Sequence, residues 1–174
     1  MSGYLGFEPL EHKSDFYFVS YNNEDSDRVG ILVRRLHEEG VRIWYDKGLT
    51  FDEKWEMEIA QKIRECGAML LFITAGVLQK EKSFVRKEYQ RAKKMKKKIY
   101  VAILDRINDE DVPDHSSFWW DDVQEHQGID LTRTPSPHEQ TGLLLDALGV
   151  LSAPPIRRAP VDTAPALANK EQAK

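Results

Sequence analysis

Residues 68–73 of the chain are Ala68-Met69-Leu70-Leu71-Phe72-Ile73, a run without a single polar side chain. A strand that faced solvent on one side would carry a polar residue at every second position, so this run predicts a strand buried on both faces. Such strands lie inside parallel sheets, where helices cover both faces. The stretch therefore indicates an α/β protein.

Four other segments complete the predicted sheet. Phe16-Tyr17-Phe18-Val19 and Ile99 to Leu104 are also continuous apolar runs, and we expect two more buried strands there. Val41 to Tyr45 and Gly128 to Leu131 mix polar and apolar residues. This mixture predicts strands at the two edges of the sheet, each with one more exposed face.

Between these strands, apolar residues recur with the period of a helix. The predicted helices are Glu24 to Glu39, Trp55 to Cys66, Ser83 to about Lys97, and a last one from roughly His138 to Leu148. Asp105 to His126 has no clear period and predicts only a loop with a short helix. Strands that alternate with helices predict a flavodoxin-like, doubly wound, five-stranded parallel sheet in the order 2-1-3-4-5.

The length of 174 residues is typical of one domain. We assign residues 1–14 to an N-terminal extension, 15–151 to the folded domain, and 152–174 to a flexible tail or linker rich in proline and alanine. No apolar run approaches the ~18 residues of a membrane span, and the N-terminus lacks the pattern of a secretion signal. We expect a cytoplasmic protein.

Several classes of function are disfavoured by what the chain carries. A net charge of -4 argues against nucleic-acid binding. Cys66 is the single cysteine and the five histidines are scattered, so we expect no metal site. We also expect no cofactor. No glycine-rich phosphate loop follows the first strand, which argues against a dinucleotide-dependent oxidoreductase. Ser20 and Thr74 stand where a phosphoacceptor receiver domain needs acidic residues.

In a sheet of this order, ligands bind at the carboxyl ends of the strands, where the winding reverses between the first and third strands. The loops at that point are Ser20 to Asp25, Asp46 to Lys54 and Thr74 to Ser83. In the first of these loops, the polar residues Ser20, Tyr21, Asn22 and Asn23 could hydrogen-bond a ribose or a phosphate. They could equally cap the following helix, and the sequence leaves both interpretations open.

Glu88 is the candidate acid at this edge. Phe84 precedes it by four residues, so on a helix the ring and the carboxylate lie one above the other. Val85, Tyr89 and Ala92 mark the core face of the same helix. Glu88 then lies on the flank of that face, where a partly shielded carboxylate can act on a cationic substrate. The alternative is a surface glutamate paired with a neighbouring lysine or arginine.

The helix that carries Glu88 is strongly basic from Arg86 to Lys98. Such a run is typical of a solvated helix face, and cations near a helix C-terminus are also favourable. It could instead attract an anionic dinucleotide or an anionic membrane. We assign no site to it.

Four segments, in this order, resemble a Toll/interleukin-1 receptor (TIR) domain of the bacterial type. They are Phe16 to Tyr21, Val41 to Gly48, Trp55 with Ile59, and Ser83 to Glu88. The resemblance covers about Asp15 to Leu151. The chain departs from the family at Phe84, where a tryptophan is common.

The resemblance implies an enzyme that cleaves the nicotinamide-ribose bond of NAD+ in defence signalling, with Glu88 as the catalytic residue. It implies contacts to NAD+, the substrate, from Ser20, Tyr21, Asn22, Asp46, Gly48, Trp55 and Phe84. It also implies self-association through the loop Asp46 to Lys54, and a separate protein that reads the product. The alternative is a non-catalytic TIR adaptor that acts by homotypic assembly.

Overall fold

The computed structural model describes residues 5–7, 15–47 and 52–149, and the strands within them form one parallel sheet. The strands are β1 (Tyr17–Ser20), β2 (Ile43–Tyr45), β3 (Ala68–Ile73), β4 (Lys98–Ile103) and β5 (Gln127–Asp130). Their order is β2-β1-β3-β4-β5, which confirms the predicted flavodoxin-like topology. At the carboxyl end of β1, Val19 pairs with Tyr45 of β2 and Ser20 with Leu71 of β3.

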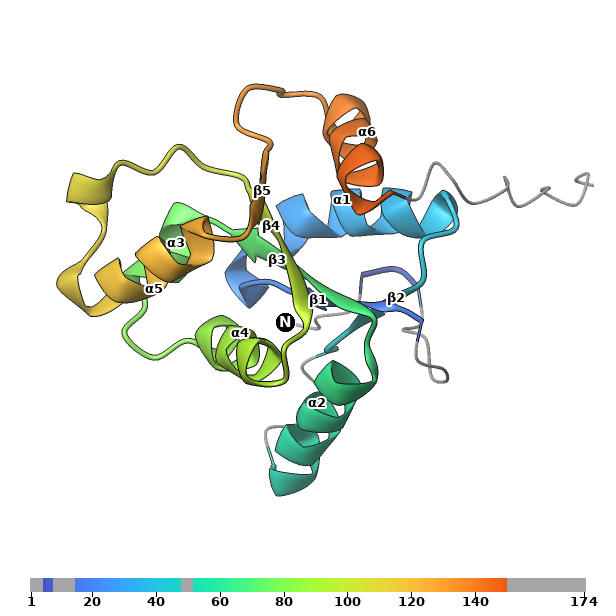
Figure 1. Cartoon of the computed structure of the whole chain (residues 1–174). Helices are drawn as coiled ribbons and strands as arrows, with labels where there is room; N and C mark the ends of the chain where they lie inside the picture. Colours follow the sequence, from blue (N-terminus) through green and yellow to red (C-terminus); the bar gives the residue numbers. More distant parts are fainter. Residues whose placement is uncertain (1–4, 8–14, 48–51, 150–174) are drawn as a thin grey trace, which may run out of the picture.

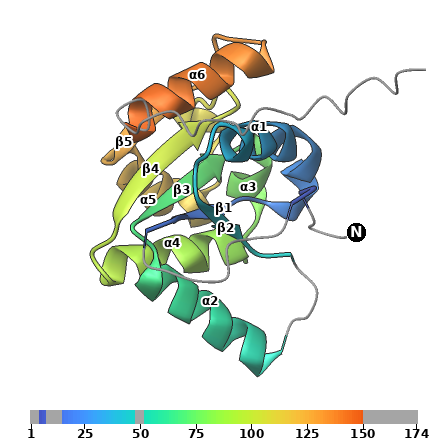
Figure 2. The same ribbon diagram turned by 90° about the vertical axis from the view of Figure 1, so that its right-hand side faces the viewer.

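Helices cover both faces of this sheet (Figures 1 and 2). The α-helices are α1 (Ser26–Glu38), α2 (Glu53–Glu65), α3 (Ala75–Gln79), α4 (Phe84–Lys94), α5 (Asp114–Gln124) and α6 (Pro137–Leu148), and the 3-10 helices are η1 (Asn23–Asp25) and η2 (Asp109–Asp111). Helices α1 and α6 pack on one face, and α2, α4 and α5 lie on the other. None of the helices in this described part is long and apolar enough to cross a membrane.

Strand β3 contributes to the cores on both sides, as its apolar run predicts. Met69, Leu71 and Ile73 pack toward α2, α4 and α5, whereas Leu70 and Phe72 pack toward α1 and α6. Each of these side chains is almost completely buried. Burial of one such side chain stabilises the fold by roughly 1.5–3 kcal/mol, so the strand fixes the centre of the domain.

The edge position of β2 is confirmed, but the exposed face that we predicted for it is wrong. All three of its residues are buried. Residues 5–7 cover one side: the Leu5 N–H donates to the Tyr45 hydroxyl at 3.0 Å, and that hydroxyl donates to the Phe7 carbonyl at 2.5 Å. The Phe7 ring also stacks on His37, with ring centroids 4.0 Å apart. The assignment of residues 1–14 to an extension stays a prediction.

Asp105 to His126 contains more helix than the sequence indicated. An eleven-residue helix, α5, occupies Asp114–Gln124. Its buried residues include the adjacent pair Trp119 and Trp120. In an amphipathic helix the buried residues form a single stripe, with three or four residues between successive members. Two adjacent tryptophans that are both buried depart from this spacing, so the sequence does not show a helical period here.

Helix α4 is shorter than predicted, because it ends at Lys94 rather than near Lys97. Lys96 takes a left-handed conformation with φ of 54°, and the Lys97 N–H donates to the Ala92 carbonyl at 3.0 Å. This is the backbone pattern that closes many helices. Part of the basic run therefore belongs to a turn.

Candidate active site

A cleft of about 250 Å³ opens where the sheet reverses its winding, at the carboxyl end of β1. We call it the Glu88 cleft. Of the residues predicted from the sequence, it brings together Tyr21, Asn22, Asp46, Trp55, Phe84 and Glu88. Ser20 contacts Glu88, and Gly48 lies outside the described residues. Asn23, which the sequence placed with Ser20 to Asn22 as a possible ligand contact, also lines the cleft. Lys80, Lys82 and Ser83 line it as well, and sequence reasoning gave them no role in a site.

Glu88 is more deeply buried than a position on the helix flank predicts. Its exposed fraction is 8%, and its Oε2 accepts a hydrogen bond of 2.5 Å from the Ser20 hydroxyl. The alternative of a paired surface glutamate is wrong, because Lys87 and Arg91 extend to Glu56 on α2, at 3.9 and 3.7 Å. Ser20 therefore holds this carboxyl at the cleft, and among the described residues no salt bridge joins it.

Burial raises the pKa of the Glu88 carboxyl from 4.5 to about 8. The Ser20 hydrogen bond opposes this rise, the charge of Asp46 adds to it, and the charge of Arg91 opposes it. A cation that entered the cleft would favour the ionised form and lower this pKa. The carboxyl is thus suited to respond to a positively charged ligand.

Two aromatic rings form the apolar wall beside Glu88. Phe84 and Trp55 meet edge to face, with ring centroids 5.2 Å apart. The Trp55 side chain is buried, whereas Phe84 is 47% exposed although it is large and apolar. An exposed ring at the mouth of a cleft offers a surface on which a flat ligand can stack.

Of the polar residues at the end of β1 and after it, Ser20 and Asn22 contact other side chains rather than cap the following helix. Ser20 is 1% exposed, and its hydroxyl donates to Glu88. Asn22 precedes η1, but its side chain makes no capping hydrogen bond to the backbone. Its amide instead contacts Asp25 at 3.3 Å and Lys80 at 2.7 Å. Tyr21 is buried, which raises the pKa of its hydroxyl.

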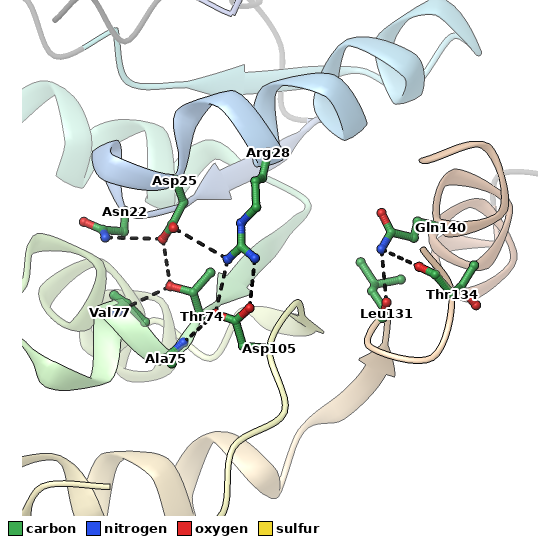
Figure 3. A network of polar contacts seen from close by, with 10 residues as sticks. All are labelled: Asn22, Asp25, Arg28, Thr74, Ala75, Val77, Asp105, Leu131, Thr134 and Gln140. Atoms are coloured by element: carbon green, nitrogen blue, oxygen red, sulfur yellow. Dashed lines mark hydrogen bonds and ion pairs between the residues drawn. The ribbon is translucent and has the colours of Figure 1, made fainter. Parts of the chain in front are cut away.

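A polar network ties the loops after β1, β3 and β4 together (Figure 3). The Thr74 hydroxyl donates to Asp25 at 2.7 Å, and Arg28 pairs with Asp25 at 3.6 Å. Arg28 also binds Asp105 at 2.8 Å, and Asp105 accepts the Ala75 N–H at 2.9 Å. The network fixes the loops after β1 and β3, which carry residues of the cleft, relative to each other and to the loop after β4.

The sheet order defines a doubly wound α/β domain, and the cleft lies at its switch point, the edge at which domains of this class bind ligands. The TIR domain family matches residues 18–145, and the chain belongs to this family. No curated protein matches the sequence.

Solved structures show the same fold. The TIR domains of "the activated Roq1 resistosome directly recognizing the pathogen effector XopQ" are 16% identical, with a TM-score of 0.59 over 77% of this chain and 98% of that chain. A metazoan TIR-STING receptor from C. gigas in complex with 2',3'-cGAMP is 13% identical, with a TM-score of 0.52. That match covers 79% of this chain and 42% of the receptor. At these identities the likeness establishes the fold.

Proposed function

We propose that the protein is an NAD+ nucleosidase that cleaves the bond between nicotinamide and ribose. The observation that carries this proposal is the buried carboxyl of Glu88, held by Ser20 in a cleft with an aromatic wall. A buried carboxyl without a cationic partner destabilises a fold. Its presence in a cleft at the switch point of the sheet therefore favours a role in catalysis over a role in stability.

The reaction needs little from the protein beyond a fixed negative charge. The C1'–N bond of NAD+ breaks, and nicotinamide leaves as a neutral molecule with the bonding electron pair. The ribose becomes an oxocarbenium-like cation, which the ionised Glu88 can stabilise or orient through the ribose hydroxyls. Water then adds to C1' and releases a proton, giving ADP-ribose. Attack by the substrate's own adenine instead gives a cyclic ADP-ribose isomer.

The substrate itself supplies the cation to which the site responds. The nicotinamide ring of NAD+ is flat and positively charged, and the Phe84 ring, which is 47% exposed, lines the same cleft as Glu88. A bound cation lowers the pKa of Glu88, so NAD+ binding favours the ionised carboxylate that the reaction uses. Release of neutral nicotinamide removes that cation.

The alternative function is a non-catalytic TIR adaptor that acts by homotypic assembly. Such an adaptor gains nothing from a carboxyl whose burial raises its pKa to about 8. The buried Glu88 therefore favours the enzyme. We propose a role in immune-type defence signalling in the cytoplasm, in which another protein reads the product, because one similar structure is a resistosome that recognises a pathogen effector.

Incubation of the purified chain with NAD+, followed by chromatography, tests the proposal. We expect nicotinamide together with ADP-ribose or a cyclic isomer, in equal molar amounts. A folded chain that leaves NAD+ intact across a wide range of protein concentration would favour the adaptor.

Phe84 provides a test of the aromatic wall. Phe84→Ala removes the ring that meets Trp55, and we expect KM for NAD+ to rise by roughly fivefold to tenfold. Phe84→Trp restores the residue common in the family and should retain or raise activity. Steady-state kinetics of nicotinamide release measures both, with circular dichroism as the check on folding. An inert but folded tryptophan variant would contradict this arrangement of the site.

We further propose that activity depends on self-association through the loop Asp46 to Lys54. The sequence places two large apolar residues, Leu49 and Phe51, in this loop, where a connecting loop has little reason to present them to water. Both lie outside the described residues, whereas Asp46 and Trp55 on either side line the Glu88 cleft. A neighbouring subunit docked on this loop would help to close the cleft. In such a contact, the loop of one subunit binds a different surface patch on its neighbour, so each added subunit offers a free loop to the next. The contact therefore propagates into open assemblies unless a ring forms.

We therefore expect specific activity to rise with enzyme concentration over about a hundredfold range around the micromolar level. Gly48→Pro, which fixes the backbone of the loop, should abolish this rise and leave the fold intact. Nicotinamide release per chain measures the effect. If activity per chain is constant and equal in the two proteins, assembly is not the switch.

A further inference from the structure

Lys80 provides a fixed positive charge in the Glu88 cleft. It directly follows α3, and its side chain lines the cleft and is partly buried. Its ammonium donates to the Asn22 amide oxygen at 2.7 Å and lies 3.1 Å from a carboxylate oxygen of Glu24. Asn22 is itself buried, so it fixes where this flexible side chain places its charge.

The cleft therefore contains charges of both signs. Asp46 and Glu88 are the acidic residues of its lining, and Lys80 and Lys82 are the basic ones. The charged groups that shift the pKa of Glu88 are Asp46 and Arg91, so neither lysine is its dominant charged neighbour. A ligand that suits the whole cleft carries a cationic group for Glu88 and an anionic group for the lysines.

Glu24 lies where an anionic ligand would bind. Its side chain is 73% exposed, and the carboxylate contacts the Lys80 ammonium from the solvent side of η1. An ammonium group donates three hydrogen bonds, and a phosphate oxygen can replace the carboxylate at one of them. Because an exposed ion pair contributes little to stability, a phosphate can displace Glu24 at little cost.

We propose that Lys80, positioned by Asn22, binds the pyrophosphate group of a dinucleotide, and that Glu24 competes with this group for the same ammonium. The inference rests on the proposed function, because it identifies the part of the NAD+ molecule that contacts this end of the cleft. Lys82 adds a second cation for the same group. The pair Lys80–Glu24 then sets how tightly the pyrophosphate binds.

ADP-ribose is the probe for this subsite, since it carries the pyrophosphate and lacks nicotinamide. Measured by calorimetry at low salt, Lys80→Met should weaken ADP-ribose binding by about tenfold, and Lys80→Arg should restore most of it. Glu24→Gln should strengthen binding by about threefold. Two control variants make the same changes in charge at exposed positions away from the cleft: Lys94→Met matches Lys80→Met, and Glu38→Gln matches Glu24→Gln. Both should bind ADP-ribose as the wild type does.

A double variant separates competition from a general change in charge. If Glu24 acts through Lys80, then Glu24→Gln should give no gain in affinity when Lys80 is already methionine. The affinity for nicotinamide riboside, which lacks the pyrophosphate, should be equal in the wild type and Lys80→Met. Equal ADP-ribose affinity in these two folded proteins, or no ADP-ribose binding by the wild type, overturns the inference. Loss of NAD+ cleavage alone does not overturn it. The proposed enzymatic function and the proposed pyrophosphate subsite can therefore fail separately.

Discussion

Glu88→Gln should fold normally and release nicotinamide from NAD+ roughly a hundredfold to a thousandfold more slowly than the wild type. Glutamine has nearly the same shape as glutamate and can still accept the hydrogen bond from Ser20, so the wall of the cleft is kept. What is lost is the negative charge that stabilises the ribosyl cation. The loss should appear mainly in kcat, because the full cation forms only as the bond breaks.

The matched control is Glu58→Gln, which makes the same chemical change on an exposed part of α2. We expect its nicotinamide release to equal that of the wild type. The measurement is the initial rate at saturating NAD+, at a protein concentration that gives full activity to the wild type. Undiminished release by a folded Glu88→Gln protein would remove Glu88 from the mechanism and with it the main support for the enzyme.

The central fold could be predicted because it depends on local patterns. The run Ala68 to Ile73 is apolar at every position, and this alone indicates a strand between two layers of helices. The burial of β2 could not be read from Val41 to Tyr45, because the cover comes from Leu5 and Phe7, nearly forty residues earlier in the chain. A local pattern contains no information about such a distant partner.

The same limit applies to the site. Sequence spacing placed Phe84 and Glu88 on one helix face, and the structure shows both at the cleft. The partner of Glu88 is Ser20, which is 68 residues away, and only the pairing of β1 with β3 brings its hydroxyl to the carboxyl. Lys80 was missed for a related reason, since lysines are common in loops and its contacts to the β1 loop exist only in the folded chain.

The second large effect is on stability, and it is independent of catalysis. The pKa of Glu88 is about 8 in the folded protein and near 4.3 in an unfolded chain. Between these values the folded state holds a proton that the unfolded state has lost, so the free energy of unfolding falls as pH rises from about 4.5 to 8. Above about pH 8 both states are ionised and the loss is complete.

Glutamine does not titrate, so Glu88→Gln should avoid this loss. As pH rises from 5 to 8, the wild type should lose on the order of 3 kcal/mol of its free energy of unfolding relative to this variant, because one pKa unit corresponds to about 1.4 kcal/mol. Asp105, Asp122 and Asp130 have lowered pKa values, so their contributions are lost at more acidic pH and are shared by both proteins.

Urea unfolding at both pH values measures the difference, and Ser20→Ala provides a second test in the opposite direction. The Ser20 hydroxyl lowers the pKa of Glu88, so its removal should raise that pKa and extend the loss of stability above pH 8. Equal pH dependence in the wild type and Glu88→Gln would show that the carboxyl is not shielded from water. A buried carboxyl that weakens the fold at neutral pH, and that glutamine could replace without this penalty, is the pattern expected where function rather than stability maintains a residue.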